Sequence, residues 1–138
     1  MQPDDVTDAE AWFERADRDL QMATLALNAD PMLGEAVAFH AQQAAEKALK
    51  GFLTAYSIAF PKTHELEGLV VKCTTINPQF QQFMIAASIL TPYATEFRYP
   101  GSRLQPFEDE ARAAYQHAAD ILQYVRDALA DATSPQSN

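Results

Sequence analysis

Residues 33–57 read LGEAVAFHAQQAAEKALKGFLTAYS, and this stretch decides the fold of the chain. Alanine and larger apolar residues occupy most of the positions outside its polar stripe, at helical spacing. The polar side chains fall on one narrow stripe: His40, Gln43, Glu46, Lys47, Lys50 and Thr54. A helix that is apolar over most of its circumference lies centrally in a bundle, or faces a core on one side and a partner on the other. The stretch therefore predicts a central helix.

A first helix is expected on the N-terminal side of this central helix. The pattern Thr7-Asp8-Ala9-Glu10 is typical of a capping box and predicts its start. Its apolar residues recur at positions 9, 12, 13, 16, 20, 23 and 27. Asp30-Pro31 should end the helix or open the next segment, because the residue before a proline disfavours helical geometry.

Further helices are expected on the C-terminal side. Thr63 is the expected N-cap of a short helix through Leu66, and Pro78 should stand near the start of the next one. Thr91-Pro92 then predicts a kink or a restart. The last helix should run from about Phe107 to Asp131 with Phe107 on its buried face, after a loop over residues 98–106.

These patterns predict an all-α fold, an up-and-down antiparallel bundle of four to five helices. The bundle should be a single domain over residues 1–132, followed by a disordered tail over residues 133–138. Cys73 is the only cysteine, so no disulfide can form within the chain, which fits a reducing compartment. No basic leader and no apolar run of about 20 residues is present, so we expect a soluble cytoplasmic protein without membrane contact.

The charge is unevenly distributed. The net charge of −9 argues against broad, non-specific binding to a polyanion. Residues 36–104, however, hold six basic and four acidic side chains, whereas the flanks hold four basic and fifteen acidic ones. A small positive surface within an acidic molecule could meet one phosphate group or one acidic partner. The alternative is that both ends simply present solvated acidic helix faces.

Familiar catalytic motifs are missing from the sequence: it has no phosphate-binding glycine loop, no HExxH and no CxxC. We expect no cofactor and no metal, because His40, His64 and His117 are more typical of surface or capping positions than of ligands. Glu46 and Lys50 stand four residues apart in the favourable order, so an ordinary surface ion pair is the simplest interpretation of that part of the stripe.

The segment Arg98-Tyr-Pro-Gly-Ser-Arg-Leu-Gln-Pro106 offers a sharper candidate site. Arg98 and Arg103 flank Tyr99 and Gly101 beside a helix start, a combination suited to a phosphate with an adjacent ring. In the alternative interpretation, Arg98 pairs with a carboxylate such as Glu96 or Glu46 and the aromatic side chains only pack.

Three motifs together give the chain a family resemblance. They are Phe39-His-Ala-Gln-Gln-Ala-Ala-Glu-Lys-Ala-Leu-Lys-Gly-Phe-Leu53, Thr63-His-Glu-Leu66 and Tyr93-Ala-Thr-Glu-Phe-Arg-Tyr-Pro100, followed by a long alanine-rich helix. In this order and spacing, over about residues 11–129, they resemble HEPN domains. The resemblance implies a helical bundle that is usually dimeric. Many such proteins are encoded beside a minimal nucleotidyltransferase, which they assist, and others are metal-independent ribonuclease toxins.

The ribonuclease branch carries an arginine and a histidine four to six residues apart, and Arg112-Ala-Ala-Tyr-Gln-His117 satisfies that spacing. Ala113, however, replaces the polar residue that usually follows the arginine. Positions i and i+5 also lie about 140° apart around a helix, so the two side chains should not converge. Glu108 is within reach of Arg112 for an ion pair.

The Arg98-Tyr99-Pro100 sequence resembles the nucleotidyltransferase-associated branch instead. The expectation is a non-catalytic homodimeric subunit of a toxin–antitoxin pair that docks a minimal nucleotidyltransferase and helps to bind nucleotide. The candidate contacts to nucleotide or partner are His40, Lys47, Lys50, Arg98, Tyr99 and Arg103. The second copy should bind through the second or the last helix. One alternative is a ribonuclease toxin that cleaves RNA with Arg112 and His117. The other is a dimeric scaffold without a ligand.

Overall fold

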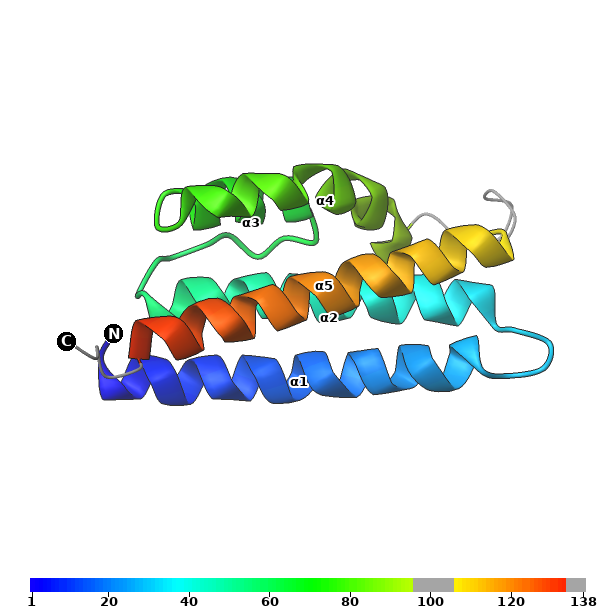
Figure 1. Cartoon of the computed structure of the whole chain (residues 1–138), viewed down its shortest axis with the longest axis horizontal. Coiled ribbons are helices and arrows are strands. Elements are labelled where there is room, and N and C mark those ends of the chain that lie inside the picture. Colours follow the sequence, from blue (N-terminus) through cyan, green and yellow to red (C-terminus); the bar gives the residue numbers. More distant parts are fainter. Residues whose placement is uncertain (96–105, 134–138) are drawn as a thin grey trace.

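The computed structural model describes residues 1–95 and 106–133, and Figure 1 shows their arrangement. Every regular element in these two ranges is a helix, so the predicted all-α fold is confirmed. The α-helices are α1 (Pro3–Leu27), α2 (Gly34–Ala55), α3 (Leu66–Thr74), α4 (Met84–Leu90) and α5 (Glu108–Thr133). Two short 3₁₀-helices, η1 (Pro78–Phe83) and η2 (Thr91–Ala94), flank α4.

The helices form an up-and-down bundle (Figure 1). The colours show that α2 and α5 run in one direction and α1 in the other. Helix α3 runs in the same direction as α2, and the η1–α4 segment then returns antiparallel to it, so that the amide of Leu66 at the start of α3 donates to the Thr91 hydroxyl at the end of α4. Helix α1 lies along one side of the α2–α5 pair, and α3 and α4 lie along the other side. The three long helices therefore build the body of the bundle, and the shorter elements cover one side of it.

Helix α2 is the central element, as its sequence predicts. Helices α1, α3 and α5 all pack against it, and its alanines at positions 38, 41, 44, 45 and 48 are buried. Small side chains allow the neighbouring helices to approach closely. At Gly51 the approach is so close that an added Cβ would lie 2.6 Å from Cε1 of Phe13 on α1. The apolar surface that was expected to receive a second copy on α2 is thus covered by helices of the same chain.

The ends of the helices differ from the sequence-based expectations. Helix α1 begins one turn before the Thr7 capping box, and the Thr7 hydroxyl donates to the carbonyl oxygen of Pro3 instead. The N-cap of α3 is Glu65, whereas the Thr63 hydroxyl accepts from the amide of Glu65 in the preceding turn. Pro3, like Pro78 in η1, starts its helix without loss because the first turn leaves its amides unpaired in any case.

The predicted restart at Thr91-Pro92 is present as η2. Thr91 itself joins two elements: its hydroxyl accepts from the amide of Leu66, which is free at the start of α3, and lies 2.5 Å from Glu67 Oε1. The prediction for Phe107 is wrong, because this side chain is 69% exposed just before α5. Its amide donates to Glu110 Oε1, so Phe107 serves the helix start through its backbone.

Two sequence-based expectations concern termini and membranes. Helix α5 continues to Thr133, and residues 134–138 of the expected tail lie outside the described ranges. Within residues 1–95 and 106–133, no helix combines the length and the apolar character needed to cross a bilayer.

Candidate functional site

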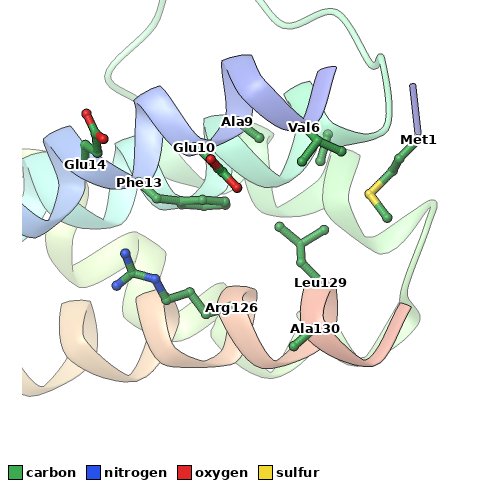
Figure 2. Close-up of a pocket in the computed structure, with 10 residues that line it drawn as sticks. Met1, Val6, Ala9, Glu10, Phe13, Glu14, Arg126, Leu129 and Ala130 are labelled. Carbon is green, nitrogen blue, oxygen red and sulfur yellow. The ribbon is translucent and has the colours of Figure 1, made fainter. Parts of the chain in front are cut away.

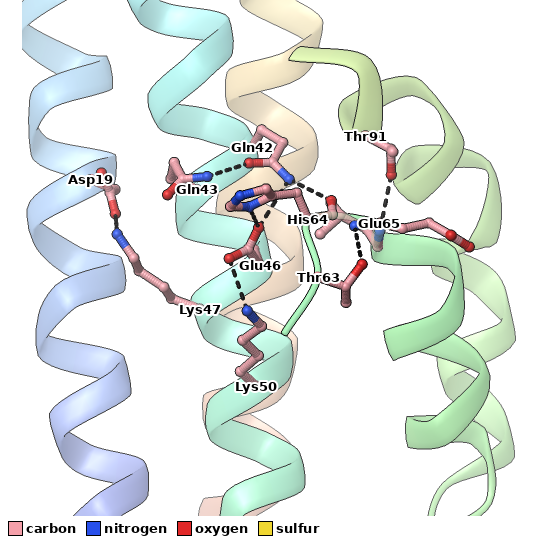
Figure 3. Close-up of polar contacts among 11 residues, drawn as sticks. Asp19, Gln42, Gln43, Glu46, Lys47, Lys50, Thr63, His64, Glu65 and Thr91 are labelled. Carbon is pink, nitrogen blue, oxygen red and sulfur yellow. Dashed lines mark hydrogen bonds and ion pairs between the residues drawn. The ribbon is translucent and has the colours of Figure 1, made fainter. Parts of the chain in front are cut away.

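Two carboxylates at the polar stripe of α2 each contact a histidine and a lysine. Figure 3 shows the contact of Asp19 with Lys47 and those of Glu46 with Lys50 and His64. The first carboxylate is Asp19 of α1. His40 Nδ1 lies 2.9 Å from Asp19 Oδ1, and Lys47 Nζ donates to Asp19 Oδ2. Because an ionised carboxylate only accepts hydrogen bonds, His40 carries a proton on Nδ1. We call His40, Asp19 and Lys47 the Asp19 cluster.

The second carboxylate is Glu46, which lies on α2 itself. Lys50 Nζ donates to Glu46 Oε2 over 3.1 Å, and His64 Nδ1 lies 2.8 Å from Glu46 Oε1. Gln42 supports this arrangement, since its Nε2 donates to the carbonyl oxygen of His64 over 2.9 Å and to Glu46 Oε1 over 3.3 Å. These contacts, visible in Figure 3, tie the segment before α3 to α2. We call Glu46, Lys50, His64 and Gln42 the Glu46 cluster.

The Glu46–Lys50 pair is buried, so its interpretation as a surface ion pair is wrong. The side chains are only 5% and 8% exposed. The Lys50 ammonium also lies 5.8 Å from the ring centroid of Trp12 and 5.7 Å from that of Phe60. Aromatic rings attract a cation through their negative faces, and the carboxylate offsets its charge. Lys50 is therefore held in place by its own chain and is closed to a ligand.

The Asp19 cluster is more open than the Glu46 cluster. The side chains of His40 and Lys47 are 24% and 21% exposed, whereas Asp19 is 12% exposed. An ammonium has three protons to donate, so Lys47 can bind a second oxygen while it stays on Asp19. Of the predicted contacts on α2, His40 and Lys47 can thus reach a ligand from the surface.

The remaining predicted contacts, Arg98, Tyr99 and Arg103, lie outside the described residues. The described residues on either side of them lie beside α2. On the N-terminal side, η2 packs against α2, and Tyr93 is buried there. On the C-terminal side, the carbonyl oxygen of Pro106 lies 3.2 Å from the position of a Cβ on Gly34. The described residues next to this part of the sequence, η2 and Pro106, therefore both lie beside α2.

Sequence reasoning missed three members of these clusters: Asp19, Gln42 and His64. A signal existed for Asp19, which stands three residues after Ala16 and four before Ala23 and so falls on the buried face of α1. Gln42 is fully buried. Its burial could not be predicted from the sequence because it depends on which helices pack around α2. His64 lies beyond the end of α2, so its contact with Glu46 depends on the path of the chain after α2.

The predicted ribonuclease pair does not come together within one chain. Arg112 is exposed and His117 is half-buried, both on α5. Two tyrosines mark different sides of α5. Tyr115 accepts a hydrogen bond from Thr24 on α1, whereas Tyr124 accepts one from Asn77 beside η1. At 100° per residue, Arg112 lies toward the Tyr115 side of the helix and His117 toward the Tyr124 side. The described part of the chain contains no ion pair between Arg112 and Glu108, so that expectation is wrong.

A separate groove of about 430 Å³ lies between the start of α1 and the end of α5 (Figure 2). Apolar side chains such as Val6 and Phe13 line it, together with the carboxylates of Glu10 and Glu14. Its one basic side chain, Arg126, donates to both carboxylate oxygens of Asp17 at 2.6 Å, a contact that raises the pKa of Arg126. Two carboxylates and a paired arginine do not suit a phosphate, so we do not assign the nucleotide site to this groove.

Two further features bear on catalysis: the reactivity of the Cys73 thiol and the grouping of side chains that could bind a metal ion. Burial raises the pKa of the Cys73 thiol to about 12, so the thiol stays protonated at neutral pH and is a poor nucleophile. Across the two described ranges, no three side chains of histidine, cysteine, aspartate or glutamate are grouped closely enough to hold a metal ion.

Comparison with known proteins identifies the relatives of this bundle. The model of the HEPN domain family matches residues 9–128. The archaeal HEPN homologue ST0689 is 28% identical, with a TM-score of 0.69 over 87% of this chain and 96% of that one. TT1696 from Thermus thermophilus is 30% identical, with a TM-score of 0.71 over 86% of this chain and 96% of that one. No match is found among curated proteins.

Proposed function

This chain belongs to the HEPN family, and from that premise we propose that it is a non-catalytic helical subunit that docks a minimal nucleotidyltransferase and helps to bind its nucleotide. In this proposal the subunit works in the cytoplasm as a homodimer, as part of a toxin–antitoxin pair. The observation that carries the proposal is the Asp19 cluster, where His40 and Lys47 of α2 are partly exposed.

The charge balance of the sequence range that carries His40 and Lys47 favours a phosphate group as the ligand of the cluster. Residues 36–104 carry six basic and four acidic side chains, and two of those four, Glu46 and Glu67, are already bound by neighbouring groups. A phosphate that reaches Lys47 must compete with Asp19 for the ammonium, so we expect moderate rather than tight binding by this chain alone. The partner enzyme, or Arg98 and Arg103, would supply the remaining positive charge.

The ribonuclease alternative has weaker support. Its arginine and histidine lie on different flanks of α5, so one phosphate cannot contact both within one chain. Metal-independent RNA cleavage that disappears in both Arg112→Ala and His117→Ala would reverse this ranking.

The site proposal predicts that Lys47→Ala and Arg98→Ala each weaken ATP binding by about 10- to 150-fold. This range corresponds to the loss of one charged hydrogen bond, about 1.5–3 kcal/mol. Arg98→Lys should recover only part of the loss, because an ammonium lacks the planar fork of a guanidinium. The measurement is calorimetric titration of each variant with ATP, with Lys72→Ala on α3 as the matched control.

Melting temperatures of the same variants separate binding from folding. Lys47→Ala also removes a partner of the buried Asp19, so it should lower stability while His40 keeps that carboxylate paired. The site assignment would be wrong if affinity for ATP stayed at the wild-type value while the melting temperature fell. Lys72→Ala should change neither quantity appreciably.

A further inference from the structure

The segment from Cys73 to Thr95 contains no charged residue, although 21% of the chain is charged. The segment is not simply buried. It forms η1, α4 and η2, and several of its side chains are exposed: Thr75, Pro78, Gln79, Gln81, Gln82, Ile85, Ser88, Ile89 and Thr95. A solvent-facing helix normally carries charged residues on its outer face. The absence of charge on this exposed surface therefore calls for a physical reason.

The outer face of α4 is apolar as well as uncharged. Ile85 and Ile89 stand four residues apart on it, and they are 75% and 40% exposed. The polar side chains beside them turn back to their own backbone: Ser88 Oγ donates to the carbonyl oxygen of Met84, and Gln82 Nε2 to that of Gln79. We call the exposed residues Gln81, Gln82, Ile85, Ser88 and Ile89 the α4 face. Protein interfaces are depleted of charge at their centres in the same way.

We infer that the α4 face is the surface through which two copies of this chain pair. The inference rests on the homodimer in the proposed function and names its interface. Each copy carries a net charge of −9, so two copies repel wherever their acidic surfaces meet. The exposed sides of α1 and of the start of α5 carry such carboxylates, including Asp8, Glu14 and Asp109.

A second copy fits this face better than a different protein does. A different protein can match an acidic surface with basic residues of its own. A second copy brings the same acidic charges, so its binding is favourable only at a surface without charged residues. In a twofold pair, the same patch is used by both chains, so α4 would lie against α4 and the isoleucines would leave water together. A stable interface covers about 800 Å² per chain, so the contact extends from α4 onto the exposed glutamines of η1.

Sedimentation equilibrium at micromolar concentration tests the inference. The wild type should sediment at twice 15.3 kDa. Ile85→Glu and Ile89→Glu should each weaken self-association at least 100-fold, because each places a carboxylate in both halves of the contact. Leu25→Glu is the matched control: this α1 side chain is 63% exposed, and its substitution should leave the dimer intact. Melting temperatures measured at low concentration should stay close to wild type in all three variants.

A wild type that sediments at 15.3 kDa would overturn the inference, as would dimers that survive both isoleucine substitutions or dissociate equally with Leu25→Glu. Titration of the same samples with a minimal nucleotidyltransferase keeps the two proposals apart. A monomer that binds this enzyme refutes the α4 dimer, and with it the homodimer of the proposed function, but supports the docking of a nucleotidyltransferase. A dimer that depends on α4 but binds neither the enzyme nor ATP supports the inference and refutes the proposed function.

Discussion

Replacing Glu46 by leucine should lower the free energy of unfolding by about 3–5 kcal/mol, the usual cost of removing one partner of a buried ion pair. The substitution removes the carboxylate from the Lys50 side chain, which is 8% exposed and lies beside the Trp12 and Phe60 rings. It also removes the acceptor of His64, so the segment before α3 loses one of its contacts with α2. Urea unfolding followed by circular dichroism measures the change.

Two controls test whether the loss of stability comes from the buried, unpaired charge. Asp17→Asn breaks the exposed pair with Arg126, whose side chains are 50% and 40% exposed, and should cost less than about 1 kcal/mol. The double variant Glu46→Leu with Lys50→Met removes both charges, and it should regain most of the stability lost in the single variant. Equal losses in the single and the double variant would show that the buried charge is not the cause.

Phe80→Ala should cost about 3–5 kcal/mol, because it opens a cavity where three elements meet. Phe80 is fully buried in η1. Its ring centroid lies 4.6 Å from that of Phe52 on α2 and 5.2 Å from that of Tyr124 on α5. This side chain therefore attaches the short helical segment of residues 66–95 to the body of the bundle.

The matched control for Phe80→Ala is Phe107→Ala, which makes the same chemical change at a side chain that is 69% exposed. Its effect should stay within about 0.5 kcal/mol. The midpoints of urea unfolding compare the two variants under identical conditions. If Phe107→Ala destabilised the chain as much as Phe80→Ala does, the assignment of η1 to the core would be contradicted.

The helices and the central place of α2 could be predicted from the sequence because each rests on a local repeat of apolar residues. The same repeat marks the buried positions of α5 from Ala111 to Val125. Phe107 does not follow this repeat because it stands just before α5, where the helical repeat no longer determines which way a side chain points. Thr7 and Thr63 resemble caps in sequence, but α1 begins at Pro3 and the N-cap of α3 is Glu65.

The candidate site was predictable only in part. The spacing of His40, Glu46, Lys47 and Lys50 placed them on one stripe of a central helix, and in the structure all four lie on α2. Their separation into a buried Glu46 cluster and a more open Asp19 cluster needed contacts that span 18 to 28 residues of sequence. No local pattern records which side of a helix another helix will cover.

Binding to a minimal nucleotidyltransferase tests the central claim most directly. The measurement is sedimentation velocity of this protein mixed at micromolar concentration with a minimal nucleotidyltransferase. The proposed function predicts a single faster species with a fixed whole-number ratio of the two chains, which Lys47→Ala or Arg98→Ala weakens and Lys72→Ala does not. Two independent boundaries at the positions of the separate proteins, unchanged on adding ATP, would contradict it.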